Sequence, residues 1–221
     1  MVATFFTDRS GGVSQGPYAS LNLARHVGDL KEDVTSNRAL ASKEFGNLAF
    51  MNQVHGDQVV VVDSVSAYEP TADALVSAQP GVSLAVLVAD CIPLLLWSDE
   101  VIAAVHVGRR GLCSDIALRT LEVMRALGAQ EIRGAMGPSI CGKCYEVGED
   151  VYQQVVADYP AAASLTSRSS KGLDLAKALK TQLFDLGVST TSSSRCTAED
   201  ASLFSYRRDG VTGRQAGIIS L

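Results

Sequence analysis

The segment SLAVLVADCIPLLLW, residues 83–97, is almost wholly apolar, yet an aspartate and a cysteine stand side by side in its middle. A carboxylate in an apolar core is costly unless it is hydrogen-bonded or paired. Because Pro93 cannot donate a hydrogen bond to a neighbouring strand, the strand should be interrupted or lose its pairing near Cys91. A buried free cysteine is common in protein cores, but that interpretation leaves Asp90 unexplained. We therefore expect an exposed strand end that presents both side chains.

The remaining segments mix strand and helix patterns without strict alternation. Aliphatic and β-branched runs predict strands at VATFF, LAFM, QVVVVD and VIAAVHV. Helical patterns predict helices over 29–46, 114–128, 149–158 and 173–186, with Ser114 as the N-cap of the second. Residues 203–221 are expected to form a hairpin that turns at Asp209-Gly210 or Thr212-Gly213. Together these elements predict a mixed-sheet α+β architecture in a single domain that spans residues 1–221.

Composition and charge argue against several classes of function. The 221 residues carry a net charge of −5, which disfavours general binding to nucleic acid or to an acidic membrane surface. The N-terminus lacks the basic region and the apolar run of a signal peptide, and no segment approaches the roughly 20 apolar residues of a membrane span. Five cysteines, an odd number without a secretory signal, indicate reduced thiols and a cytoplasmic location.

The chain contains three histidines, and two of them stand at predicted strand ends. His55 lies in NQVHGDQV immediately before a strand, and His106 ends the strand VIAAVHV before a predicted turn, GRRG. Cys91 occupies a comparable position. Two imidazoles and one thiolate would make a three-ligand zinc site with one position open, which is the arrangement of catalytic zinc. The spacing of these three residues in the sequence does not by itself establish a metal site. The alternative is that the two histidines are hydrogen-bonded within the protein and bind no metal.

Six ordered motifs resemble those of one known family. They are GGVSQGPYASLNLARHVGD, NQVHGDQVVVVD, ADCIPLLL, AAVHVGRRG, GPSICGKCYEVG and FSYRRDGVTGRQA, and the resemblance extends from Asp8 to the end of the chain. The chain is similar to the family once called polyphenol oxidoreductases or multicopper-type laccases, whose members are now regarded as purine nucleoside phosphorylases that also deaminate adenosine. The resemblance implies a layered α/β sandwich and a zinc site formed by His55, Cys91 and His106.

The sequence departs from the motifs of this family at several positions. The resemblance implies tryptophan where Arg109 stands, an exchange of residue types at Ser139 and Cys141, and cysteine where Glu199 stands. The three expected metal ligands are intact, so these departures bear on substrate preference. The C-x-x-C spacing of Cys141 and Cys144 has no second pair in the sequence, and core or loop thiols are the favoured interpretation.

Further site residues follow from the resemblance and from side-chain chemistry. Asp90 is a candidate catalytic carboxylate that orients a metal ligand or accepts a proton, with backbone capping as the alternative. Guanidinium groups match phosphate oxygens, and Arg110, which matches the arginine of the family's GWRG motif, is preferred over Arg109 as the catalytic phosphate ligand. The expected substrate-binding residues are Arg9, Asn22, Tyr145 and Arg207.

The favoured function is that of a zinc-dependent purine nucleoside phosphorylase, which uses phosphate to cleave adenosine, inosine or methylthioadenosine. Adenosine deamination is a second expected activity. A copper-binding polyphenol oxidase is one alternative, since Cu²⁺ competes well at nitrogen and sulfur sites, but three histidines are too few for a four-copper centre in one subunit. A metal-free hydrolase with Cys91 as nucleophile and His106 as base is another. The expected partners are a small nucleoside and inorganic phosphate, without nucleic acid or membrane.

Overall fold

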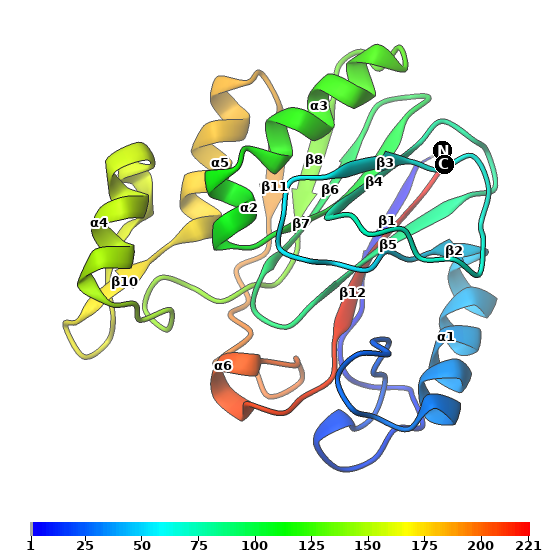
Figure 1. Cartoon of the computed structure of the whole chain (residues 1–221), viewed down its shortest axis with the longest axis horizontal. Coiled ribbons are helices and arrows are strands. Elements are labelled where there is room, and N and C mark those ends of the chain that lie inside the picture. Colours follow the sequence, from blue (N-terminus) through cyan, green and yellow to red (C-terminus); the bar gives the residue numbers. More distant parts are fainter. Residues whose placement is uncertain (1) are drawn as a thin grey trace.

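Two mixed β-sheets face one another at the centre of the molecule (Figure 1). The structure, a computed structural model, describes residues 2–221. The four-stranded sheet has the order β1 (Ala3–Phe6), β12 (Gln215–Ser220), β5 (Ser83–Val88) and β2 (Leu48–Ala49). The six-stranded sheet has the order β11 (Ser189–Ser192), β8 (Arg133–Met136), β6 (Ile92–Trp97), β7 (Ile102–Val107), β4 (Ala74–Ser77) and β3 (Val59–Val61). A two-stranded ribbon consists of β9 (Ala163–Leu165) and β10 (Lys171–Leu173).

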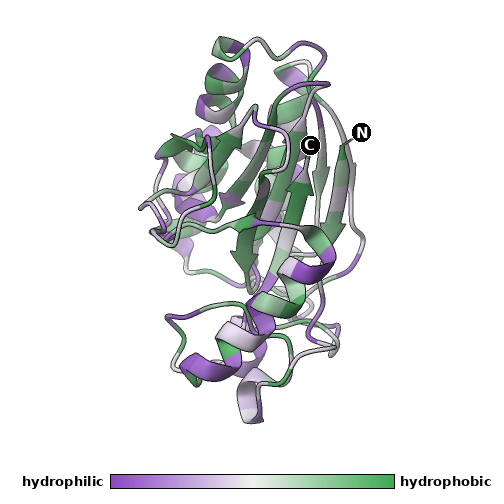
Figure 2. Cartoon of the chain, turned by 90° about the vertical axis from the view of Figure 1, so that its right-hand side faces the viewer, coloured by the Kyte–Doolittle hydropathy of each residue, from purple (hydrophilic) through white to green (hydrophobic). Residues whose placement is uncertain are grey.

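Helices cover the outer faces of the two large sheets. The longer helices are α1 (Lys31–Phe45), α3 (Ile116–Ala126), α4 (Glu149–Asp158) and α5 (Leu175–Asp185). The short ones are α2 (Arg109–Cys113), α6 (Tyr206–Asp209), η1 (Gly16–Tyr18) and η2 (Pro160–Ala162). α1 packs on the four-stranded sheet, and α3, α4 and α5 pack on the side of the six-stranded sheet, while apolar residues concentrate in the strands (Figure 2). These layers confirm the predicted α+β sandwich with mixed sheets.

The core between the sheets follows the two-residue alternation of the strands. β7 directs Ile102 and Ala104 toward the four-stranded sheet, and Ala103 and Val105 toward the helices. His106 continues the first series, so its side chain lies on the inter-sheet face at the end of β7. Full burial of a large aliphatic side chain contributes about 1.5–3 kcal/mol. The packed sheets therefore hold the strand ends in fixed positions.

The apolar segment 83–97 is interrupted, as the sequence predicts. β5 ends and β6 begins within it, and these two strands belong to different sheets. Residues 89–91 therefore form the passage by which the chain crosses from one sheet to the other. Asp90 has a φ of 95° there, a conformation that most residues avoid, and Cys91 follows it directly.

Three local predictions are wrong. The C-terminal residues do not form a hairpin, because the Ser205 hydroxyl accepts the N–H of Arg208 at 3.2 Å and caps α6, after which β12 pairs with β1 and β5. The predicted GRRG turn is instead the start of α2. Ser114 does not cap α3, since Asp115 holds the N-cap position with a φ of 57°. The Asp115 carboxylate accepts the hydroxyl of Tyr159 at 2.7 Å instead of capping the helix.

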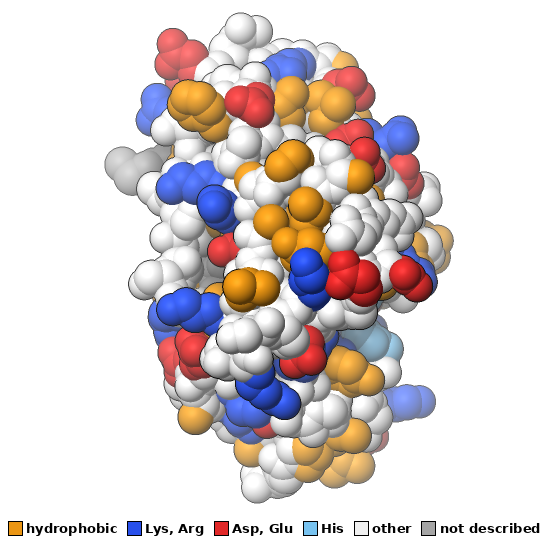
Figure 3. Space-filling model, turned by 90° about the vertical axis from the view of Figure 1, so that its left-hand side faces the viewer, with side chains coloured by type: hydrophobic (Ala, Val, Ile, Leu, Met, Phe, Trp, Pro, Cys, Tyr) orange, Lys and Arg blue, Asp and Glu red, His pale blue; other side chains and the backbone are white. Residues whose placement is uncertain are grey.

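The outer surface mixes charges of both signs. On the face that carries α4 and the two-stranded ribbon, basic and acidic side chains are interspersed (Figure 3). None of the helices within residues 2–221 has both the length and the apolar character that crossing a membrane requires.

Candidate active site

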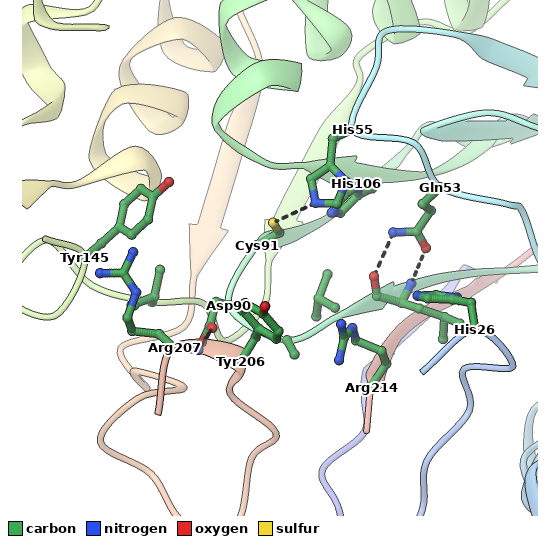
Figure 4. A pocket seen from close by; sticks show the side chains of 14 residues that line it. His26, Gln53, His55, Asp90, Cys91, His106, Tyr145, Tyr206, Arg207 and Arg214 are labelled. Atoms are coloured by element: carbon green, nitrogen blue, oxygen red, sulfur yellow. Dashed lines mark hydrogen bonds between the residues drawn. The ribbon is translucent and has the colours of Figure 1, made fainter. Parts of the chain in front are cut away.

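Three potential metal ligands converge where the two sheets meet at their ends. His55, Cys91 and His106 each offer a nitrogen or sulfur atom, and these atoms lie within 4.8 Å of one another. The Sγ atom of Cys91 is 3.9 Å from Nε2 of His55. The two imidazole rings pack edge to face with their centroids 4.6 Å apart. Figure 4 shows the three side chains grouped together, and we refer to them as the His-Cys-His centre.

A different local feature positions each ligand. Cys91 lies in the passage between the sheets, and His106 lies at the end of β7. His55 lies in the loop before β3 with a φ of 59°, a left-handed conformation that histidine adopts more readily than most residues. A Cβ atom at Gly108 would lie 3.1 Å from both Cys91 Sγ and His55 Cδ2. The absence of a side chain at Gly108 therefore leaves room for the centre.

Asp73, which was not singled out from the sequence, holds two of the three ligands. Its carboxylate is fully buried and accepts the Nδ1–H of His106 at 2.8 Å and the backbone N–H of His55 at 2.9 Å. Its second oxygen accepts the N–H groups of Val54 and Gly56 at 3.2 and 2.7 Å. Burial by itself raises the pKa of Asp73, but the hydrogen bonds and the charge of His106 outweigh it and lower the pKa. Asp73 is therefore a carboxylate at neutral pH.

The same contacts set the protonation of the ligands. Because Nδ1 of His106 donates to Asp73, Nε2 is the ring nitrogen available to a metal ion. Burial lowers the pKa of His106, but the Cys91 sulfur and Asp73 outweigh this effect and raise it. Burial raises the pKa of Cys91, but the charge of His106 and hydrogen bonds from both histidines lower it. The centre thus favours the thiolate, which is the metal-binding and nucleophilic form of cysteine.

The donor set and its spacing fit a tetrahedrally coordinated ion such as zinc. Zinc–sulfur bonds of about 2.3 Å and zinc–nitrogen bonds of about 2.0 Å place sulfur and nitrogen about 3.5 Å apart at tetrahedral angles. The observed 3.9 Å between Cys91 and His55 requires an adjustment of only a few tenths of an ångström. Three protein ligands would leave the fourth position open to water or substrate.

A cavity of about 410 Å³ opens beside the His-Cys-His centre. Small-molecule pockets have volumes of about 300–1,000 Å³, so this cavity can accept a ligand of nucleoside size. Figure 4 shows Tyr145 and Arg207 at one end of it, and Arg214, His26 and Gln53 at the other. The metal ligands lie between the two ends, within reach of the middle of a bound molecule.

Three further predicted residues, Asp90, Tyr145 and Arg207, line this cavity. The Asp90 carboxylate accepts the hydroxyls of Thr197 and Ser205, both at 2.6 Å, and the backbone N–H of Arg207 at 2.7 Å. Asp90 therefore ties the passage between the sheets to the segment that carries Arg207. The Arg207 guanidinium lies over the Tyr145 ring, 5.0 Å from its centroid.

Arg9, Asn22 and Arg110 are not among the residues that line the cavity. Arg110 is exposed on α2, whereas Arg109 is half-buried, and its charge opposes the effect of burial on the pKa of Tyr145. Asn22 is fully buried, and its side-chain oxygen accepts the N–H of Arg214 at 2.9 Å. Asn22 thus contacts the cavity region through the backbone of another residue.

Arg214 and His26 also line the cavity, and of these two Arg214 was not identified from the sequence. Burial lowers the pKa of Arg214, and the negative charges of Cys91 and Asp90 oppose this effect. Burial also lowers the pKa of His26, and the nearby Arg214 lowers it further, so His26 is neutral at pH 7. The GRQA motif held a usable signal for Arg214, since it places an arginine directly before a buried strand.

Fold and site together define a two-sheet α+β protein with a candidate metal centre and a ligand-sized cavity at the sheet ends. Comparison with known proteins then shows the family. The profile of a family described as multi-copper polyphenol oxidoreductase laccase matches residues 3–221, and the chain belongs to this family.

Relatives and solved structures agree with this membership over almost their full lengths. A protein named purine nucleoside phosphorylase from Corynebacterium glutamicum is 45% identical, with 100% of this chain and 94% of that protein covered. A protein of the same name from Deinococcus radiodurans is 46% identical, with 98% and 88% covered. The crystal structure of a Neisseria meningitidis protein has a TM-score of 0.92 at 35% identity, with 100% and 94% covered. The resemblance inferred from the six motifs is therefore confirmed.

Proposed function

We propose that the chain is a zinc-dependent purine nucleoside phosphorylase, which uses inorganic phosphate to cleave the bond between a purine and its ribose. The observation that supports this most directly is the His-Cys-His centre beside a nucleoside-sized cavity, in a chain whose relatives carry that enzyme name. Adenosine, inosine and methylthioadenosine are the proposed substrates. Adenosine deamination is proposed as a second activity of the same site.

Arg214 suits the binding of phosphate. Phosphorolysis joins a phosphate oxygen to the anomeric carbon and breaks the carbon–nitrogen bond, whose electron pair leaves with the purine. The site must therefore attract an anion in a protein of net charge −5. Within residues 2–221, both hydrogen bonds of the Arg214 guanidinium use Nη1, toward the carbonyls of Thr212 and Gly213. Nε and Nη2 remain as donors to phosphate oxygens.

The opposite end of the cavity suits the purine. Tyr145 offers an aromatic face, and because burial raises its pKa its hydroxyl remains a hydrogen-bond donor at neutral pH. A hydrogen bond from this hydroxyl to a ring nitrogen would stabilise the departing base. Asp90 holds this side of the cavity in place through the backbone N–H of Arg207, which supports a positioning role for the carboxylate.

His55, Cys91 and His106 would hold the zinc ion. When bound, zinc would supply Lewis-acid and electrostatic stabilisation beside the substrate, which is also the chemistry that deamination needs. Asp73 fixes the tautomer and the orientation of His106, and its backbone contacts hold the loop that presents His55. These residues therefore form a preorganised set of donors.

A metal-free cysteine hydrolase is the second candidate, and one observation favours it. Asp73, His106 and Cys91 form a series of carboxylate, imidazole and thiolate, in which the carboxylate orients the base. Copper also suits the donor set of the His-Cys-His centre. The three histidines of the chain nevertheless cannot build a four-copper oxidase within one subunit. The metal content separates these candidates.

Elemental analysis of protein purified without added metal, followed by nucleoside assays with and without phosphate, tests the proposal. We expect zinc in the protein, and phosphate-dependent release of adenine or hypoxanthine with ribose 1-phosphate. Nucleoside cleavage that persists without metal and without phosphate would instead identify the cysteine hydrolase. Equal product formation without phosphate would rule out phosphorolysis.

Arg214→Ala is expected to lower kcat/KM for phosphate by about 10²–10³-fold, as for loss of one direct donor to a transition-state anion. The zinc content should stay unchanged, because Arg214 is not a metal ligand. Steady-state kinetics with varied phosphate give the measurement, and Arg133→Ala, at an exposed arginine far from the cavity, is the matched control. Arg110→Ala tests the sequence-based assignment. Loss of phosphate use in Arg110→Ala, with normal kinetics in Arg214→Ala, would reverse the two roles.

A further inference from the structure

Four metal-binding side chains gather at a second place, outside the His-Cys-His centre. Each presents a sulfur or carboxylate oxygen atom, and these atoms lie within 4.8 Å of one another. The residues are Cys141, Cys144, Cys196 and Glu199. We propose that this group, which we call the three-cysteine cluster, binds one zinc ion as a structural site. The proposal does not depend on the reaction that the enzyme performs.

The backbone arranges the cluster before any ion binds. The ligands come from two short turns, and each turn carries two ligands that are three residues apart. In the first turn the N–H of Cys144 donates to the carbonyl of Cys141 at 3.0 Å. In the second turn the N–H of Glu199 donates to the carbonyl of Cys196 at 3.2 Å. A β-bridge between Ser139 and Cys196 sets the turns side by side. Across them, the N–H of Cys141 donates to Sγ of Cys196 at 3.3 Å.

The chemistry of the donors points to zinc. Structural zinc sites are tetrahedral and closed by four protein ligands, usually cysteines in pairs separated by two to four residues, and carboxylate oxygen is also a zinc ligand. Zinc–sulfur bonds of about 2.3 Å place two sulfur atoms about 3.8 Å apart at tetrahedral angles. Since the donor atoms of the cluster already lie within 4.8 Å of one another, an ion would draw them together by about 1 Å at most.

Charge and access also suit a cation with anionic ligands. Three thiolates and one carboxylate around one Zn²⁺ carry a net charge of about −2, so positive neighbours stabilise the site. Lys143 stands between two of the ligands in the sequence. Cys144 opens onto a surface hollow of about 240 Å³ that is also lined by Lys143, Arg168 and Arg207. The hollow gives an ion a route to the sulfur atoms.

An ion at this place would hold one side of the cavity. Tyr145 directly follows the ligand Cys144, and Thr197 directly follows Cys196 and donates its hydroxyl to Asp90 at 2.6 Å. Within the described residues, the two turns are connected by the β-bridge and by the hydrogen bond from Cys141 to Cys196, and neither turn belongs to a helix or a strand of the sheets. The metal would therefore link the turn that precedes Tyr145 to the turn whose Thr197 holds Asp90, the carboxylate that accepts the backbone N–H of Arg207.

Zinc counting on the full-length protein, purified under reducing conditions, tests the proposal. We expect two zinc ions per chain. Cys144→Ser should lose one of them, His55→Asn should lose the other, and the double variant should lose both. Cys113→Ser, at an exposed cysteine on α2, is the matched control and should keep two. In His55→Asn protein loaded with Co²⁺, the thiolate-to-cobalt absorption should be intense, and it should disappear when Cys144→Ser is added.

Glu199→Gln covers the case in which Cys144→Ser fails to fold, because it retains every sulfur atom. This variant should release the second zinc ion to a chromophoric chelator at least tenfold more readily than the unchanged protein. An unchanged zinc content in Cys144→Ser, or an unchanged rate of zinc release from Glu199→Gln where Cys144→Ser does not fold, would overturn the proposal. A disulfide among these cysteines in freshly purified protein would also overturn the proposal. It would lower the mass of the chain by about 2 Da, and the protein would then bind a single zinc ion.

Discussion

Replacement of His55 by asparagine is expected to remove one equivalent of zinc and to lower phosphorolytic activity more than 100-fold. Loss of a partner outside the ligand shell already costs roughly 10–100-fold in metal affinity or activity, and loss of a direct ligand should exceed this. Asparagine tolerates positive φ, so the backbone at 59° is preserved and the fold should remain intact. Elemental analysis and nucleoside turnover on the same preparation give the measurement.

His26→Asn is the matched control for this prediction. His26 is the remaining histidine and lines the same cavity, but it does not belong to the His-Cys-His centre, so its replacement should leave the zinc content unchanged. A metal-free hydrolase that uses Cys91 and His106 would keep its activity in His55→Asn. Normal zinc content together with normal turnover in that variant would contradict the assignment of His55 as a ligand.

The sequence predicts the central strands well because local pattern decides them, but it did not predict β4, β8 and β11 of the six-stranded sheet. β5, β6 and β7 are apolar runs whose neighbours in the sheet are equally apolar, so hydrophobic periodicity alone places them. The C-terminal segment behaves differently. Ser205 and the N–H of Arg207 are held by the carboxylate of Asp90, which lies more than 100 residues earlier in the chain. A turn motif read locally cannot anticipate such a contact, and the predicted hairpin was wrong for that reason.

The metal-ligand candidates could be found in the sequence because histidine is rare in this chain and its strand-end positions stand out. Asp73 was not identified, since a single aspartate before an apolar strand is equally typical of a loop residue that caps backbone groups. Its role becomes visible only when the loop that contains His55 folds against the start of β4. The relation of Arg109 and Arg110 was similarly hidden, because adjacent helical residues point about 100° apart and the start of α2 was not foreseen.

Asp73→Asn is expected to destabilise the fold by about 3–5 kcal/mol and to weaken zinc binding at the His-Cys-His centre by roughly 10–100-fold. Each carboxylate oxygen accepts two hydrogen bonds, so either orientation of the asparagine amide leaves two donors facing an NH₂ group. For a chain of this length the loss corresponds to about 6–20 °C in Tm. Asp63→Asn, at an exposed aspartate after β3, is the matched control and should change neither quantity.

The pH dependence of this destabilisation identifies its source. The folded-state pKa of Asp73 is lowered, so the stability that its carboxylate contributes is present above the unfolded-state pKa of about 4 and is lost as the pH falls through the folded-state value. The difference in unfolding free energy between the unchanged protein and Asp73→Asn should therefore shrink as the pH falls into the acid range. Denaturant unfolding at several pH values measures it, and zinc competition well below both Tm values measures the ligand effect separately. Two results would contradict this role of Asp73. One is a stability difference that does not change as the pH falls, and the other is an unchanged zinc affinity in the folded variant. Either result would show that Asp73 does not act through its charged contacts with His106 and with the loop that contains His55.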